Sequence, residues 1–301
     1  MIRYQRCPIC DSTGIQQVLT ATDHTVSREK FSIWQCAMCS LRFTQNVPEP
    51  NEIGRYYKSE NYISHSETSK GIINWLYLRV RKFTLSSKRN FIEDQTGVKK
   101  GNLLDIGAGA GAFIHHMKEH GWNVEGLEPD DQAIQRASRE YNLQLKPSSQ
   151  LFSFQPDTFD AITMWHVLEH VHDLHGYIAH IKKICKPGGK IFIAVPNYTS
   201  YDADHYASSW AAYDVPRHLY HFSPASMLEL MKKHRCVIEK MQPMWFDSFY
   251  VSLLSEKYKT GHSNLLKGFW YGLRSNMKAF YNKRRASSII YVINPAAQMP
   301  A

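Results

Sequence analysis

The chain has 301 residues, 43% hydrophobic and 21% charged, an ordinary globular composition with room for one large domain and accessory segments. No uncharged apolar run approaches the ~20 residues that a membrane-spanning helix needs, and residues 1–6 lack the apolar core of a signal peptide. We therefore expect a soluble, cytoplasmic protein without a transmembrane segment.

The formal net charge is +9, and the positive charge is unevenly distributed. No acidic residue follows Glu256, whereas these basic residues do: Lys257, Lys259, Lys267, Arg274, Lys278, Lys283, Arg284 and Arg285. A second basic stretch contains Lys70, Arg79, Arg81, Lys82, Lys88 and Arg89. Such stretches suit phosphate-bearing substrates, nucleic acid or a membrane surface, and solvated helix faces explain them equally well.

Two C-x-x-C pairs lie at the start of the chain, with short strand patterns between them around Val18-Leu19 and Phe31–Trp34. The pairs are Cys7 with Cys10 and Cys36 with Cys39. Four thiolates close a tetrahedral, structural zinc site and leave no open position for catalysis. So small a module lacks a sufficient core, and metal binding would supply its folding energy. We predict a zinc ribbon over residues 1–47, with a dithiol redox pair as the alternative.

Residues 48–100 are predicted to form a helical lid or linker. An aromatic and polar stretch, which includes Tyr57 and Tyr62, precedes a helical pattern that continues to about residue 90. In that pattern apolar residues recur at a spacing near 3.6, as in an amphipathic helix: Ile72, Leu76, Val80 and Phe83. The two tyrosines are candidates for a lid, or for ordinary surface packing.

Glycines alternate with small residues directly after the apolar pair Leu103-Leu104, and a helical pattern begins near Ala112. The pattern predicts a strand, a tight turn and a helix, in which Gly107, Gly109 and Gly111 let a ligand approach the backbone. The N-terminus of the helix adds free N–H groups and the positive end of its dipole. A nucleotide-like cofactor is the expected occupant.

Asp105 decides which cofactor fits this turn. The glycines are also compatible with the dinucleotide fingerprint. However, a carboxylate two residues before the first glycine would repel a pyrophosphate and would suit the amino group and sulfonium of S-adenosylmethionine. Residues 122–128 are the predicted second strand, and Glu128 at its end is placed to accept hydrogen bonds from both ribose hydroxyls.

Strands and helices continue to alternate after Glu128. Asp130 is predicted to cap a helix that runs to Tyr141. Further strands are expected over residues 143–145, 159–164, 190–195, 237–241 and 288–292. The sequence Lys186-Pro187-Gly188-Gly189 is expected to end a helix and form a tight turn.

Histidines gather after two of these strands. His166 and His170 are four residues apart, so one helical turn would aim both inward; a metal pair is the alternative, although no third ligand is evident. After the fifth strand, residues 214–223 form a dense polar cluster that contains Arg217, His218 and His221. Open α/β sheets place their ligands at this end of the strands.

A segment of about residues 249–285 precedes the last strand. It contains two helical patterns and is rich in aromatic residues. We interpret it as a helical cap beside the acceptor site, and a dimerisation surface is an equally good explanation.

Together these motifs resemble the class I S-adenosylmethionine-dependent methyltransferases. The resemblance rests on D-x-G-x-G-x-G from Asp105, L-E-H-V-x-D from Leu168, and K-P-G-G from Lys186. The ribbon and the P-R-H-L-Y-H-F-S run from Pro216 resemble a bacterial zinc-ribbon methyltransferase group with relatives among sugar C-methyltransferases. This implies an α/β fold with a Rossmann-like seven-stranded sheet over residues 101–301, an N-terminal zinc ribbon and a helical insertion before a last, antiparallel strand.

The resemblance also implies roles for individual residues. Asp105, Gly107, Gly109, Gly111, Glu128, Trp165 and His166 would bind S-adenosylmethionine. His170 and His218 are candidate general bases, and Arg217 and His221 candidate acceptor ligands. The acceptor would lie between residues 165–170, 217–221 and 249–285.

Three functions remain open at this point. A methyltransferase acting on a sugar, nucleotide sugar or similar metabolite is favoured. An RNA methyltransferase that docks through the ribbon and the basic helices is the first alternative, and a non-catalytic cofactor-binding interaction module is the second. The sequence gives no indication of the oligomeric state.

Overall fold

The computed structural model describes residues 1–57 and 72–295, with side chains of the second range described from residue 83 onward. Tyr62 and Lys70 lie outside the described residues, as do the side chains of the predicted apolar stripe before Phe83. The chain divides into two compact units, one of residues 1–63, 168–174 and 194–291, the other of residues 64–167, 175–193 and 292–301. The predicted ranges 1–47, 48–100 and 101–301 do not coincide with these units.

The first unit contains a four-stranded antiparallel sheet in the order β1-β2-β3-β8. Its strands are β1 (Ile15–Thr22), β2 (Lys30–Cys36), β3 (Arg42–Thr44) and β8 (Tyr220–His221). The strands predicted around Val18 and Phe31 are therefore confirmed. Phe43 pairs with both Trp34 and Tyr220, so residues far along the chain complete the sheet of the N-terminal segment.

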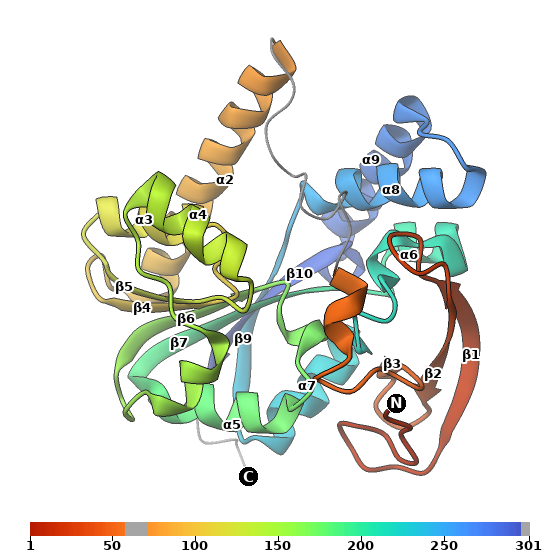
Figure 1. The fold of residues 1–301 in the computed structure, drawn as a ribbon, viewed down its shortest axis with the longest axis horizontal. Coiled ribbons are helices and arrows are strands. Elements are labelled where there is room, and N and C mark those ends of the chain that lie inside the picture. The colour runs from red at the N-terminus through yellow and green to blue at the C-terminus, as the bar shows by residue number, and fades with distance from the viewer. Residues whose placement is uncertain (58–71, 296–301) are drawn as a thin grey trace. The chain divides into compact units, whose positions relative to one another are not determined.

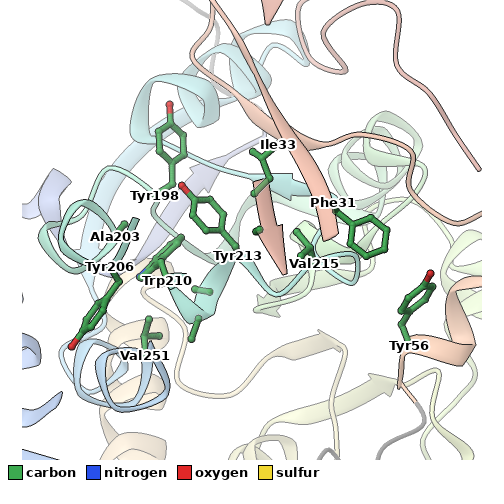
Figure 2. Packing of buried hydrophobic residues seen from close by; sticks show 13 residues of the cluster. Phe31, Ile33, Tyr56, Tyr198, Ala203, Tyr206, Trp210, Tyr213, Val215 and Val251 are labelled. Carbon is green, nitrogen blue, oxygen red and sulfur yellow. The ribbon is translucent and has the colours of Figure 1, made fainter. Parts of the chain in front are cut away.

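An aromatic core joins this sheet to the loop that follows strand β7 (Cys185–Pro196). Figure 2 shows Phe31 and Ile33 of β2 in one buried cluster with Tyr198, Trp210 and Tyr213. Three short helices lie in this loop, α6 (Tyr201–Tyr206), η4 (Ala207–Ser209) and η5 (Ala211–Tyr213), and the last of them contains Tyr213. Because both segments bury apolar side chains in one core, the N-terminal segment is integrated into this unit.

Two helices, α8 (Asp247–Thr260) and α9 (Leu265–Tyr281), form a hairpin in the first unit (Figure 1). Gly261 ends α8 with a φ of 84°, a conformation that glycine adopts without a steric cost. Asn264 caps α9 by accepting a hydrogen bond from the Lys267 N–H at 3.0 Å. The two predicted helical patterns are thus confirmed.

The second unit contains the parallel strands that carry the glycine turn. Strand β4 (Asn102–Ile106) pairs in parallel with β5 (Asn123–Leu127) and β6 (Phe159–Trp165), and helices α3 (Ala112–Glu119) and α4 (Asp131–Tyr141) follow β4 and β5. The Asp130 carboxylate accepts the Gln132 N–H at 2.9 Å, which confirms the predicted cap. Helix α2 (Ile72–Thr96) precedes these strands.

The strands of the larger sheet are hydrogen-bonded in the order β5-β4-β6-β7-β10-β9. The remaining strands are β7 (Cys185–Pro196), β9 (Val237–Pro243) and β10 (Ser288–Asn294); helix α5 (Leu174–Ile184) precedes β7, and helix α7 (Pro224–Lys233) precedes β9. Both β7 and β10 contribute residues to each unit. This α/β arrangement agrees with the predicted Rossmann-like class.

Two local predictions need correction. Residues 143–145 form no strand in the described chain, where only a single bridge joins Lys146 to Leu127, so six strands replace the expected seven. Pro147, which has no N–H to donate, follows that bridge at once. Helix α5 ends at Ile184, and Pro187 and the two glycines after it lie within β7 instead of forming a separate turn.

Among the described helices, none combines the length and the apolar character needed to span a bilayer.

Candidate active site

The glycine turn after β4 is shaped by two close approaches and one open side. Gly107, Gly109 and Gly111 all have positive φ values, 75°, 55° and 81°. A Cβ atom on Gly107 would lie 2.3 Å from Val167 Cγ2, and one on Gly111 would lie 2.9 Å from Leu143 Cδ1, whereas nothing lies within 4 Å of that position on Gly109. The turn is therefore packed at its ends and leaves space for a ligand at its middle glycine.

Asp105 is a buried carboxyl group at the C-terminal end of β4, with 1% of its surface exposed. The Thr163 hydroxyl donates to its Oδ1 at 2.6 Å. Burial raises the pKa of Asp105 to about 7, although the hydrogen bond from Thr163 and the charge of Lys88 oppose the shift. A cationic ligand beside this carboxyl would favour its ionised form.

Glu128, at the end of β5, ties the glycine turn to the start of α4. Its Oε2 accepts the Gly109 N–H at 2.7 Å, and its Oε1 accepts the Asp130 N–H at 3.1 Å. Burial raises the pKa of Glu128, while these two backbone donors lower it. Each carboxylate oxygen has a second lone pair, so both can still accept a ligand hydroxyl.

The ring face of Trp165 already attracts a cation. The Lys88 ammonium lies 4.0 Å from the Trp165 ring centroid, and its charge acts on Asp105. The ring also meets Phe113 of α3 edge-on at 5.6 Å. Its indole Nε1 is buried and has no hydrogen-bond partner among the described residues. An aromatic face, a buried carboxyl and a spare donor suit a cationic cofactor that also carries acceptor atoms.

The predicted helical turn from His166 to His170 is wrong. His166 has a φ of 58°, and only Leu168–His170 form a short 3-10 helix, η3. The four-residue spacing therefore does not place both rings on one helical face. His166 falls in the second unit, with the cofactor candidates, and His170 in the first.

The two cysteine knuckles have the same backbone geometry. In each, the fourth residue after the first cysteine, Asp11 or Ser40, has a positive φ and donates its N–H at 3.1 Å to the carbonyl of that cysteine. The N–H of the first cysteine in turn donates at 2.9 Å to a carbonyl five residues later, from Cys7 to Ser12 and from Cys36 to Leu41. Two independent turns that fold alike bring both pairs of thiols into the same orientation.

The four thiols converge on a point. Cys7 Sγ lies 3.4 Å from Cys39 Sγ, and Cys10 Sγ lies 3.5 Å from Cys36 Sγ. All four sulfur atoms lie within 4.8 Å of one another, and none forms a disulfide. Tetrahedral Zn–S bonds of about 2.3 Å require sulfur atoms about 3.8 Å apart, so the cluster is compatible with one zinc ion.

His170 and His218 form a pair in the first unit. Their ring centroids are 4.6 Å apart and nearly perpendicular. Nδ1 of His218 lies 2.8 Å from the Ala212 carbonyl, and Nδ1 of His170 lies 3.0 Å from the Arg217 carbonyl and 3.0 Å from the Tyr57 hydroxyl. Carbonyls only accept, so both neutral rings carry their proton on Nδ1 and present the lone pair of Nε2.

The surroundings of this pair keep His170 uncharged. Burial and the charge of His218 lower the pKa of His170 to about 4. The buried carboxylate of Glu169 completes a set in which one ligand atom from each of Glu169, His170 and His218 lies within 4.8 Å of the others. Such a set can orient a base, and it can also hold a divalent metal ion.

Arg217, a predicted acceptor ligand, is enclosed within the protein. Its side chain is fully buried, and its guanidinium bonds to Asp23 at 3.0 Å, to Asp214 at 2.6 and 2.9 Å, and to the Tyr56 carbonyl at 2.7 Å. A further bond reaches Thr25 Oγ1. With these donors engaged and no exposed surface, Arg217 is the centre of an internal ion-pair network.

His221 is likewise enclosed, contrary to the prediction that it binds the acceptor. It lies in β8 with 3% of its surface exposed, and its Nε2 lies 3.1 Å from Thr44 Oγ1. Its ring meets Tyr213 edge-on at 5.0 Å, and burial holds its pKa well below the usual range. These contacts assign it to the packing of the N-terminal sheet.

The sequence patterns missed three residues of these sites. Lys88 was noted only as part of a basic stretch, and Asp23 and Glu169 were not singled out. Asp23 lies 194 residues before Arg217, so no local pattern connects them. Glu169 is part of the L-E-H run, and in the sequence its only signal is an acidic residue directly before a histidine.

Parallel strands that end in a glycine turn and two buried carboxyl groups define a Rossmann-like cofactor-binding domain. A family model described as "Methyltransferase domain" matches residues 77–239, more than half of the 301 residues. The chain therefore belongs to the methyltransferase domain family.

Two individual methyltransferases match a shorter part of the chain than the family model does. The ubiquinone biosynthesis O-methyltransferases of Idiomarina loihiensis and Saccharophagus degradans are 34% and 31% identical over 115 and 117 residues, 36% of this chain in each case. The alignments cover 47% and 50% of those proteins, so the chain spans about half the length of the relatives it matches. Among solved structures, the geranyl diphosphate C-methyltransferase of Streptomyces coelicolor A3(2) is similar, with a TM-score of 0.47, 16% identity, and coverage of 69% of this chain and 79% of that one.

Proposed function

We propose that this chain transfers a methyl group from S-adenosylmethionine to a small-molecule acceptor. The observation that carries the proposal is the buried carboxyl of Asp105, whose neighbouring Trp165 face already attracts an ammonium group. S-adenosylmethionine carries two positive groups, an α-ammonium and a sulfonium. When bound, it supplies a methyl group that is activated for direct displacement.

The residues of the second unit suit the parts of this cofactor. Asp105 would pair with the α-ammonium, and Glu128 would accept the ribose hydroxyls while it holds the Gly109 N–H. The open side of Gly109 lets the cofactor approach the backbone. Trp165, the last residue of β6, and His166, which follows it, would line the methyl-bearing side. Protein groups that hold the reactants in line lower the barrier by up to about 7–11 kcal/mol in ideal cases.

The affinity for S-adenosylhomocysteine, which retains the α-ammonium, is expected to rise between pH 6 and pH 8. The pKa of Asp105 is raised to about 7, so the carboxyl is neutral below that pH and negatively charged above it. The charged form attracts the ammonium, and the affinity should change by up to about tenfold per pH unit below the pKa. Isothermal titration calorimetry at several pH values measures this dependence.

Asp105→Asn should bind S-adenosylhomocysteine more weakly, by roughly 1.5–3 kcal/mol. The affinity of this variant should also lose most of its dependence on pH. Glu128→Gln is the matched control: it removes the neighbouring carboxylate and should keep a pH dependence from Asp105, displaced to lower pH because the charge of Glu128 raises the pKa of Asp105. An unchanged pH profile in Asp105→Asn would refute this assignment, and tight NAD binding without any S-adenosylhomocysteine signal would refute the cofactor.

The acceptor is the finer part of the proposal. The matched relatives are named for methylation in ubiquinone biosynthesis, and the ribbon-containing architecture resembles a group related to sugar C-methyltransferases. Both support a small metabolite with a hydroxyl or an acidic carbon, a sugar or nucleotide sugar among them. A mass-shift screen of metabolite pools and RNA with the wild-type protein tests this. If only RNA is methylated, and RNA binding falls steeply with salt, the acceptor is RNA and the small-metabolite proposal is wrong.

A hydroxyl or carbon acid must lose a proton when it is methylated. His218 is our candidate base, because the Ala212 carbonyl holds its Nδ1 proton and leaves the Nε2 lone pair available. His170 packs against it and stays neutral, so it does not compete for the proton.

We also propose that the four-cysteine cluster binds one structural zinc ion. Metal analysis of the purified protein should give about one zinc per chain, because the four thiols fit a closed tetrahedral site. Cys36→Ser should lower the zinc content below half an equivalent. Cys185→Ser, at a buried cysteine outside the cluster, should leave it unchanged. A wild-type protein without metal but with a reversible disulfide would favour the redox alternative.

A further inference from the structure

Helix α9 has its large apolar side chains on the outside. Leu266 is 84% exposed and Phe280 is 76% exposed, and the other members of this outer face are also exposed. At 100° per residue, the set falls within about half of the helix circumference. The outer face consists of Leu265, Leu266, Phe269, Trp270, Met277, Phe280 and Tyr281.

Small residues form the opposite, buried face of α9. They are Gly268, Gly272, Ser275 and Ala279. A Cβ atom on Gly272 would lie 2.8 Å from the Phe249 Cα of α8, and one on Gly268 would lie 2.9 Å from the Leu253 Cα. The helices of the hairpin are thus held together by close backbone packing, which fixes the direction of the outer face.

The outer face continues onto the two residues before α8 and onto the first turn of α8. The Asn276 side chain donates to the Trp245 carbonyl at 2.7 Å, which places the exposed Trp245 and Phe246 beside α9. Phe249 stacks on Phe269 at 5.1 Å. An apolar surface of this extent on a folded domain indicates an interaction site, because scattered single residues do not form a continuous face.

The charge around this face is positive. Lys267, Arg274 and Lys278 are exposed on α9, and Lys283 and Arg284 are exposed just after it. No acidic residue follows Glu256, and Glu256 itself is buried. The expected partner is therefore negatively charged and apolar at the same time.

We infer that the α8–α9 hairpin binds the surface of a membrane that contains anionic lipids. The outer face of α9 would enter the boundary between headgroups and acyl chains, where tryptophan and tyrosine are favoured. The adjacent basic residues would contact the lipid phosphates. The hairpin would lie on the bilayer, in keeping with the absence of a spanning helix among the described residues.

Two other partners fit the face less well. A two-fold dimer through α9 would bring the lysines and arginines of both copies together, and no acidic residue lies on α9 or after it in the sequence to pair with them. Single-stranded RNA stacks on aromatic rings, but it gains little from aliphatic side chains such as Leu265, Leu266 and Met277, which are all more than half exposed. The inference does not depend on the proposed catalytic function.

Vesicle flotation of the full-length protein tests the inference. The protein should float with phosphatidylcholine vesicles that contain phosphatidylglycerol, and binding to pure phosphatidylcholine should be much weaker. Each removed lysine or arginine should weaken binding to the anionic vesicles about fivefold. The double variant Lys267→Gln with Lys278→Gln should therefore bind these vesicles roughly 25-fold more weakly than the wild type. The exposed pair Lys99→Gln with Lys100→Gln is the charge-matched control and should bind like the wild type.

The apolar contribution is tested separately. Phe269→Ser should weaken vesicle binding about tenfold or more, whereas Phe152→Ser, at a phenylalanine of similar exposure outside the hairpin, should not. Brominated lipids should quench tryptophan fluorescence in the wild type, and Trp270→Phe combined with Trp245→Phe should remove most of this quenching. Circular dichroism of each variant confirms that it is folded.

Several outcomes would overturn the inference. They are an absence of flotation with anionic vesicles at low salt, or equal losses in the control variants. A dimer that Phe269→Ser converts to a monomer, without vesicle binding, would assign the face to a second copy. Tight RNA binding that the lysine substitutions abolish, again without flotation, would assign it to nucleic acid.

Discussion

Replacing Arg217 with methionine is expected to lower the free energy of unfolding by about 3–5 kcal/mol, the usual cost of breaking a buried ion pair. Arg217 and Asp23 are both fully buried, and Asp214 is the second partner. Burial alone would raise the pKa of Asp23. The Ser27 and Thr25 N–H groups and the charge of Arg217 together have the larger, opposite effect, so the pKa is lowered overall. Methionine fills much of the space but leaves both carboxylates without their cation. Urea denaturation at pH 7 measures the effect.

The pH dependence gives a second readout of the same network. The folded-state pKa values of Asp23 and Asp214 are both lowered, so their contribution to stability is present above the unfolded pKa, about 3.9, and is lost as the pH falls through the folded values. The difference in the free energy of unfolding between the wild type and Arg217→Met should therefore become smaller below about pH 4.

Arg136→Met is the matched control for Arg217→Met. Arg136 pairs with Glu140 at 2.7 Å on α4, but both side chains are about one-third exposed, so the loss should stay below about 1 kcal/mol. If Arg217→Met instead keeps its stability and raises the Michaelis constant of the acceptor, the original acceptor-binding prediction is right and the structural role is wrong.

Features that depend on neighbours in sequence could be predicted. The Asp130 cap, the strand before Asp105 and the paired cysteine knuckles each need only a few consecutive residues, because capping and turn chemistry act over one turn of chain. The fold class followed from these local signals and their order.

Features that depend on distant residues could not be predicted. Arg217 and Asp23 lie on different segments, and only the packing of the aromatic core around Trp210 and Phe31 brings them together. Periodicity also identifies an apolar helix face without showing which way it points. On α9 the residues around Gly272 pack inward because only small side chains allow the close approach to α8, and the large residues therefore point outward.

His218→Asn is expected to lower the turnover number by about 10²–10⁴-fold, the usual contribution of a general base. The asparagine amide can keep the N–H bond to the Ala212 carbonyl, but it has no lone pair that accepts a proton at neutral pH. Single-turnover measurements with saturating S-adenosylmethionine separate this loss from changes in product release. The affinity for S-adenosylhomocysteine should be nearly unchanged.

The exposed His262, in the loop between α8 and α9, provides the control substitution His262→Ala, which should turn over at the wild-type rate. If His218→Asn retains full turnover but melts at a lower temperature, then His218 is a packing residue and the base lies elsewhere. Metal analysis of the same variant distinguishes a base from a ligand. A divalent ion bound in addition to the zinc proposed for the cysteine cluster, and lost in both His218→Asn and Glu169→Gln, would show that His218 holds a metal instead of accepting the proton.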